Sequence, residues 1–163
     1  MVILHMGNTK PFVQAACLCE NVLIEKDGVP SLIRLIDKID AQIPKDKPAD
    51  IPSGFPVTFF IRLGSAEALG SGKILIQPKR PDGTLGGKIE VEVALPGKGH
   101  GVQFKAPFMV LNPQAGFYWF NVFWNGDFIT SFPMEVTLTE VPQLTGTNLP
   151  IATSPTPTSS EKR

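Results

Sequence analysis

Hydrophobic and polar residues alternate with a period of two along much of this chain, and this is the pattern of half-buried β-strands. The clearest example is residues 88–95, where apolar side chains share one face while Glu90 and Glu92 share the other. No segment shows the spacing of a convincing amphipathic helix. The alternation therefore predicts an all-β protein. Regular strands are predicted at residues 12–24, 55–63, 73–78, 88–95 and 102–108.

Residues 111–136 predict a β-hairpin, and they contain both tryptophans and the only tyrosine. Asn125-Gly126 separates two apolar runs, and both residues tolerate the positive φ that a type I′ turn requires. Upstream, Pro113 and Gly116 precede Tyr118 at the start of a strand. This arrangement is typical of a tyrosine corner, a structural device in which the phenol hydroxyl bonds to the backbone a few residues earlier. We therefore expect an antiparallel, immunoglobulin-like β-sandwich of about eight strands.

Within residues 12–24 the alternation falters. It places both cysteines on the core face, and a β-bulge near Glu20-Asn21 would then bring Val22 and Ile24 onto that face. The predicted strand is therefore continuous but bent.

The segment that follows is ambiguous, because residues 31–39 fit both helical spacing and strand alternation. The turn at Asp27-Gly28 and the proline at position 30 favour a strand paired with residues 12–24. Residues 41–56 contain four prolines and predict a long surface connection. Turns are predicted at residues 70–72 and 81–83, and a loop at 97–101.

Three parts of the chain follow from these patterns. Residues 1–11 are expected to form a flexible N-terminal segment, and residues 12–140 the β-sandwich domain. Residues 141–163 are rich in Thr, Ser and Pro, with too few apolar side chains to offset the entropy lost on ordering. They predict a disordered tail.

Charge and composition narrow the classes of partner. Lys+Arg and Asp+Glu number 15 each, and the basic residues are scattered, so we expect no binding to nucleic acid. The first residues are too short an apolar run for a signal peptide or a membrane span. The expectation is a cytoplasmic protein without a membrane partner.

Few residues of the sequence suggest a catalytic or metal-binding site. The histidines, His5 and His100, lie far apart in the sequence, and Cys17 and Cys19 form at most half of a zinc site. Two positions apart in a strand, the cysteines are badly placed for a mutual disulfide, so we expect them reduced and buried. The acidic pair of residues 90 and 92 fits a solvated strand face. The sequence predicts no metal site, no cofactor, no catalytic residues and no enzymatic activity.

The hairpin has two apolar faces where an outer sheet of a sandwich should have one. If Tyr118 faces the core, then Phe117, Trp119 and Phe123 face away from it. Phe60 likewise opposes its core-facing neighbour. The second face must be covered by the 41–56 connection, the N-terminal segment, another subunit or a ligand. The candidate interface or ligand face comprises Phe117, Trp119, Phe123 and Phe60.

Residues 16–20 (AxLCE) and 28–39 (GxxSLIxLIDxI) resemble the opening strands of a family of small uncharacterised bacterial all-β proteins. Residues 116–136 (GxYxFxVxxxG followed by PxxV) are similar to the closing hairpin of that family. Arg34 and Ile36 stand where the family more often has Gly and Phe. The resemblance implies a bacterial or phage β-sandwich and no known activity.

Together these features predict a non-catalytic module that binds a protein partner or assembles with itself through its second aromatic face. The alternative is a β-sandwich that stacks a carbohydrate or another small molecule on Trp119. The third hypothesis, which the sequence favours least, is an enzyme.

Overall fold

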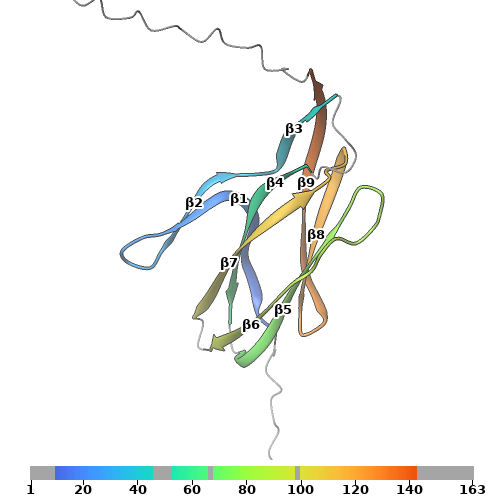
Figure 1. Cartoon of the computed structure of the whole chain (residues 1–163). Helices are drawn as coiled ribbons and strands as arrows, with labels where there is room; N and C mark the ends of the chain where they lie inside the picture. The colour runs from blue at the N-terminus through green and yellow to red at the C-terminus, as the bar shows by residue number, and fades with distance from the viewer. Residues whose placement is uncertain (1–9, 46–52, 66–67, 98–99, 143–163) are drawn as a thin grey trace, which may run out of the picture.

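The computed structural model describes residues 10–45, 53–65, 68–97 and 100–142. These residues form nine strands and no helix, so the predicted all-β, immunoglobulin-like sandwich is confirmed (Figure 1). Within the described ranges, no helix has the length and hydrophobicity needed to cross a membrane. The strands are β1 (Phe12–Ile24), β2 (Pro30–Leu35), β3 (Lys38–Pro44), β4 (Gly54–Gly64), β5 (Leu69–Lys79), β6 (Ile89–Pro96), β7 (Gly101–Leu111), β8 (Gly116–Trp124) and β9 (Asp127–Val141).

The strands form two sheets that pack face to face. One sheet has the order β2-β1-β4-β7 and the other has the order β3-β9-β8-β5-β6. All pairs are antiparallel except β3 with β9. The inward residues of 55–63, 73–78 and 102–108 face the core as the alternation predicted. The larger core residues include Phe59, Ile61, Ile74, Ile76, Phe120, Val122, Met134 and Val136.

Phenylalanine rings fill the centre of the core. Phe59 of β4 and Phe120 of β8 meet edge to face, with ring centroids 5.1 Å apart, and both are fully buried. Phe108 lies 5.2 Å from Phe59, and Phe132 stacks on Phe120 at 5.6 Å. Such pairs add about 0.5–1.5 kcal/mol each beyond the burial of their area. This cluster joins β4 and β7 of one sheet to β8 and β9 of the other.

The hairpin prediction is confirmed in detail. Asn125 has φ 49° and Gly126 has φ 91°, as a type I′ turn requires. At the other end of β8, the N–H of Gln114 donates a hydrogen bond of 2.8 Å to the Tyr118 hydroxyl, which is the predicted tyrosine corner. The two devices fix both ends of β8.

The predicted strand within 31–39 is confirmed for β2, which pairs with β1. The chain then crosses to the other sheet at Ile36-Asp37, where the Ile36 N–H bonds to β1 and the Asp37 carbonyl accepts from the Glu135 N–H of β9. The prediction of a surface connection beginning at residue 41 was wrong for residues 41–44, which belong to β3. They form a strand because they pair in parallel with β9. Residues 46–52 lie outside the described residues.

Two local predictions were also wrong. The bulge in β1 lies between Val13 and Ala15, not near Glu20. The predicted turn at residues 70–72 is part of β5. The glycine at position 72 serves packing, because it leaves room for the Trp124 indole. A Cβ atom on Gly72 would lie 2.0 Å from Cζ2 of Trp124.

This contact gives a stability prediction. Gly72→Ala should lower the free energy of unfolding by about 2 kcal/mol, because Trp124 must leave its packed position. Urea unfolding measures the change. Gly87→Ala is the matched control, since a Cβ atom there meets nothing within 4 Å, and it should stay within about 0.5 kcal/mol of the wild type. Equal effects at the two positions would contradict the packing described for Trp124.

Candidate interaction surfaces

Aromatic side chains lie on the outer surface of the five-stranded sheet. Because Tyr118 and Phe120 point into the core, Phe117 and Trp119 point outward and remain 54% and 44% exposed. Phe128 of β9 is 59% exposed and meets Phe123 edge to face, with ring centroids 5.9 Å apart. We call Phe117, Trp119, Phe123 and Phe128 the aromatic face.

The pairing of β5, β8 and β9 shows which residues lie beside the aromatic face. Trp119 lies between Lys79 of β5 and Pro133 of β9. The next row is polar, and in it the Ser131 hydroxyl donates a 2.9 Å hydrogen bond to the Asn121 side chain. The row beyond is apolar. From β5 to β9, these two rows read Gln77, Asn121, Ser131 and then Leu75, Phe123, Phe128.

Phe60 does not belong to this face, and its assignment as an interface residue was wrong. It lies on the outer side of the other sheet and is only 2% exposed. It packs there with Cys19 and Val22 in a second apolar cluster. The two cysteines were therefore assigned to the wrong side of their sheet. Leu18 is the buried β1 residue of the main core, and Val13 and Ala16 pack against that core.

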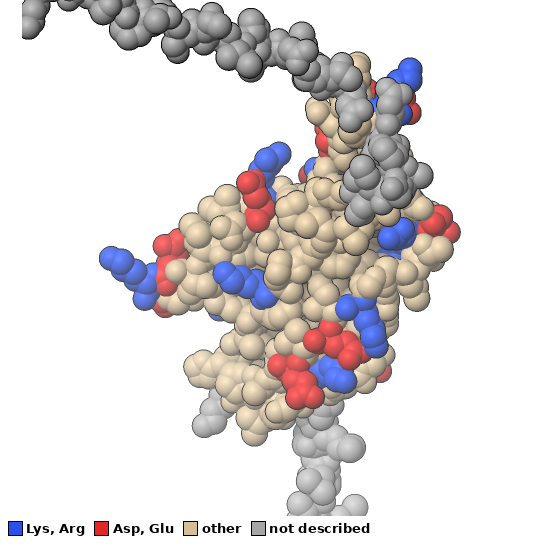
Figure 2. All heavy atoms as spheres, viewed as in Figure 1, with Lys and Arg blue, Asp and Glu red and all other residues tan. Residues whose placement is uncertain are grey.

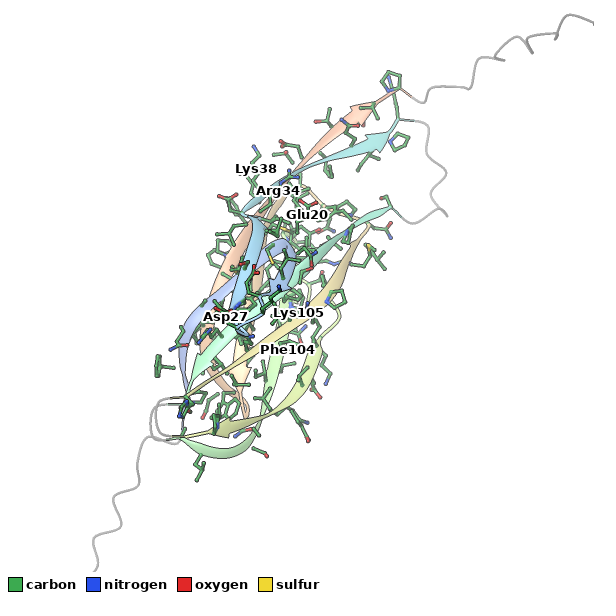
Figure 3. The ribbon with its side chains drawn as sticks, turned by 90° about the vertical axis from the view of Figure 1, so that its left-hand side faces the viewer. Glu20, Asp27, Arg34, Lys38, Phe104 and Lys105 are labelled. Carbon is green, nitrogen blue, oxygen red and sulfur yellow. The ribbon has the colours of Figure 1, made fainter. Side chains whose placement is uncertain are left out.

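The β1–β2 hairpin covers Phe60. The Lys105 ammonium of β7 donates a 3.0 Å hydrogen bond to the Val22 carbonyl, and the Thr58 hydroxyl donates one of 3.2 Å to the Glu20 carbonyl. Near the hairpin tip, the Gln103 amide donates to the Gly28 carbonyl. Figure 3 looks onto this hairpin and shows Lys105 beside it. The cover is thus intramolecular, from a segment that sequence reasoning had not considered.

The two cysteines are shielded from solvent to different degrees, with Cys19 buried and Cys17 half-buried. Burial raises the pKa of Cys17, with a contribution from neighbouring Cys19, and burial also raises the pKa of Cys19. Both thiols are free. His100 is exposed, whereas His5 lies outside the described residues. In the part of the chain that the structure describes, no three His, Cys, Asp or Glu side chains are grouped so as to hold a metal ion.

Some acidic side chains form surface ion pairs, namely Glu20, Asp40, Glu90 and Asp127. Glu90 lies 2.9 Å from the Lys88 ammonium and 3.6 Å from that of Lys73, and the hydrogen bond from Lys88 leads these effects in lowering the pKa of Glu90. Figure 2 shows charges of both signs gathered over β5 and β6. Glu92 is also exposed, so both carboxylates lie on the solvated strand face that the alternation predicted.

Among the cavities of the described structure, two that lie away from the aromatic face contain charged side chains in their lining. One, of about 420 Å³, is lined by two ion pairs, Arg34 with Glu20 at 3.4 Å and Lys38 with Asp40 at 3.7 Å. Figure 3 shows Glu20, Arg34 and Lys38 together where β2 passes into β3. The other, of about 180 Å³, lies between the end of β7 and the β5–β6 connection. It is lined by Pro78, Arg80, Gly86, Gly87, Phe108, Met109, Val110, Leu111 and Tyr118.

Sequence reasoning missed Phe128 and the smaller cavity. A two-residue turn at Asn125-Gly126 pairs Phe123 with Phe128, so the register could have identified Phe128. The smaller cavity had no such signal, because it joins residues from three separate parts of the chain.

Comparison with known proteins finds only weak likenesses to solved structures. No protein-family model and no curated protein matches the chain. Among solved structures, an immunoglobulin-like protein of Pseudomonas aeruginosa is similar at 15% identity and TM-score 0.37, over 80% of this chain and 98% of that one. An alkylpurine DNA glycosylase of Pseudomonas fluorescens, bound to DNA, is similar at 12% identity and TM-score 0.43, and a β-glucosidase of Listeria innocua at 11% and 0.40. The matches cover 75% and 78% of this chain but only 30% and 16% of those two proteins.

The different environments of two phenylalanines give a second prediction. Phe60→Ala should lower the free energy of unfolding by about 3 kcal/mol, because it opens a cavity beneath the hairpin. Phe117→Ala should change it by less than about 1 kcal/mol, because the ring is half exposed. Denaturant unfolding of both variants measures the difference. A small effect at Phe60 would contradict the hairpin cover.

Asp82, in the β5–β6 connection, gives a pH prediction. Hydrogen bonds from the Thr84 hydroxyl, the Gln114 amide and the Thr84 N–H lower its pKa from 3.8 to about 2. Because the folded pKa is the lower one, this carboxylate stabilises the fold above pH 3.8, and the contribution is lost as the pH falls towards 2. As the pH falls through that window, the urea concentration at the unfolding midpoint should decrease less for Asp82→Asn than for the wild type. Equal decreases would contradict the hydrogen bonding described for Asp82.

Proposed function

We propose that this chain is a non-catalytic interaction module that binds a protein surface through the aromatic face. The observation that carries the proposal is the outward row of β8, where Phe117 and Trp119 remain about half exposed while their neighbours are locked in the core. Exposed Trp and Phe side chains that lie together are typical anchors of protein interfaces.

The rigidity of β8 favours binding. Its inner row is buried, the turn at Asn125-Gly126 closes one end, and the Tyr118 corner holds the other. The backbone that carries the outer side chains is therefore already ordered, and little backbone entropy remains to be lost when a partner binds.

The size of the aromatic face sets the expected strength of binding. Covering the exposed parts of Phe117, Trp119 and Phe128 would remove about 300 Å² from water, since each aromatic side chain offers roughly 150–250 Å² in all. At about 25 cal/mol/Å² this is worth roughly 7 kcal/mol before the costs of association. Those costs are about 4–15 kcal/mol. We therefore expect weak association unless neighbouring residues of the sheet also take part.

A second copy of the chain is one partner of suitable chemistry. The formal net charge is zero, and the aromatic face is bordered by both Lys79 and Glu135, so two copies would not repel each other strongly. Two sheets of this kind pack face to face when their strands are nearly aligned. A different protein with an apolar surface would satisfy the same face.

A carbohydrate is the second candidate ligand. The polar row of Gln77, Asn121 and Ser131 lies beside Trp119, and sugars are bound by stacking on a tryptophan with amide and hydroxyl groups nearby. However, the Gln77 amide already donates to the Gly86 carbonyl and Ser131 already bonds Asn121. The protein partner is therefore favoured.

The remaining features of the proposal stay predictions. The raised pKa values of both thiols disfavour nucleophilic thiolates at neutral pH and so favour a non-catalytic role. A cytoplasmic location fits two free thiols. Membership of the bacterial family rests on the motifs of the opening strands and the closing hairpin.

Light scattering over a dilution series tests the proposal. If a second copy is the partner, the wild type should show a mass that rises with concentration, and Trp119→Asp should remain a monomer because a charge cannot be buried in that face without a partner. Leu69→Asp is the matched control, since Leu69 is 78% exposed but lies outside the aromatic face. It should associate like the wild type.

A wild type that is monomeric at every concentration leaves a foreign protein or a sugar, and the indole NMR signals separate these. Trp119 is exposed and Trp124 buried, so oligosaccharides should shift the Trp119 signal if the second candidate is right. If Trp119→Asp matches the wild type in self-association, in sugar titration and in binding to an identified protein partner, the aromatic face is not the functional surface.

A further inference from the structure

The outer edge of β7 has backbone groups that no strand of the described residues uses. The Asn112 N–H donates to the Ser53 carbonyl, and the Ser65 N–H donates to the His100 carbonyl. Residues on an antiparallel strand alternate between bonding to the neighbouring strand and pointing away from it. Even-numbered residues of β7 therefore bond to β4, and odd-numbered residues direct their N–H and C=O groups outward. Within the described structure, β7 pairs with β4 alone.

Two residues interrupt the middle of this edge. Pro107 has no N–H to offer, which suits its outward position and blocks pairing in the middle of the strand. Lys105 extends towards the β1–β2 hairpin and adds a charge, another common protection of sheet edges. Met109 and Leu111 carry neither a proline ring nor a charge, and their side chains are about half exposed. The Leu111 carbonyl accepts one long hydrogen bond from Arg80. The open stretch that follows Lys105 and Pro107 is therefore the end of β7, from Met109 to Leu111.

The smaller cavity adjoins this open end. Four consecutive residues of β7 line it, which places it along the strand edge and not over one face. Gly86 and Gly87 form part of the opposite wall, in the connection that Figure 1 shows beside the arrowhead of β7. Its volume of about 180 Å³ matches a single bulky side chain, because a cavity of about 150 Å³ holds one benzene ring. It is too small for most cofactors or drug-sized ligands, whose sites occupy about 300–1,000 Å³.

Arg80 gives the cavity a positive charge. Its guanidinium donates one long hydrogen bond, of 3.5 Å, to the Leu111 carbonyl. No carboxylate of the described residues lies within ion-pairing distance of it. Asp82 is near enough for the Arg80 charge to help lower its pKa, but its hydrogen bonds come from Thr84 and Gln114. A carboxylate of a bound molecule would therefore find a cation with free donors.

From these observations we propose that the end of β7 binds an extended acidic peptide of a partner protein. The peptide backbone pairs with the outward groups of Met109 and Leu111 and so adds a strand to the four-stranded sheet. One apolar side chain of the peptide enters the cavity beneath Tyr118, and a carboxylate near it binds Arg80. This site is separate from the aromatic face and does not depend on the function proposed there.

Selection from a displayed library of short random peptides against the full-length wild type provides the test. Met109→Pro removes one outward N–H without disturbing the ladder to β4, and Met109→Leu is its control. Gly87→Leu fills the cavity, since a Cβ atom at Gly87 meets open space, and Gly87→Ala is its control. Unfolding midpoints and circular dichroism establish that each variant is folded.

We expect enriched peptides with an apolar residue, β-forming neighbours and an acidic residue. Both Met109→Pro and Gly87→Leu should weaken their binding about tenfold or more, while the two controls and Trp119→Asp bind like the wild type. Binding should also slow hydrogen exchange at the Met109 and Leu111 amides. No enrichment, or peptides insensitive to both variants, would overturn the proposal. Peptides sensitive only to Trp119→Asp would overturn it as well and would instead support the aromatic face. A wild-type dimer dissociated by Met109→Pro would show that a second copy occupies the edge.

Discussion

The packing of Phe120 against Phe59 is the interaction on which the rest of the structure depends. These two rings join the central strands of the two sheets, and Phe108 and Phe132 pack around them. Once Phe120 is fixed in the core, strand alternation determines to which side of the sheet each of the remaining β8 side chains points. Trp119 and Phe117 must then point outward. The exposed aromatic residues are a geometric consequence of the core, and the chemistry of those side chains is what remains free to serve a function.

The crossing of the chain at Ile36-Asp37 is the second organising feature. It lets the first part of the chain contribute β1 and β2 to one sheet and β3 to the other. Just before it, Arg34 adopts φ 49°, a conformation that is costly for any residue with a Cβ atom. Glycine would adopt it freely.

Local patterns predicted most of the fold because most of it is decided locally. The Asn125-Gly126 turn, the Tyr118 corner and the alternation of β4 to β7 follow from neighbouring residues. The errors arose where distant partners decide the outcome. Residues 41–44 form a strand because β9 lies beside them, and Gly72 serves the indole of Trp124. Phe60 was misassigned because alternation reveals a second apolar face but not that the β1–β2 hairpin covers it.

The two surfaces would select partners by different physics. On the aromatic face, recognition depends on side-chain area and shape, so many apolar surfaces could compete for it. At the end of β7, main-chain hydrogen bonds supply much of the attraction and are indifferent to sequence, so the cavity and Arg80 must supply the selectivity. Pro107 and Lys105 interrupt the edge, so that the open stretch beside the cavity is limited to Met109 and Leu111. Such a short edge disfavours continuous strand pairing between copies but still admits a short peptide, and this difference separates a binding site from an aggregation hazard.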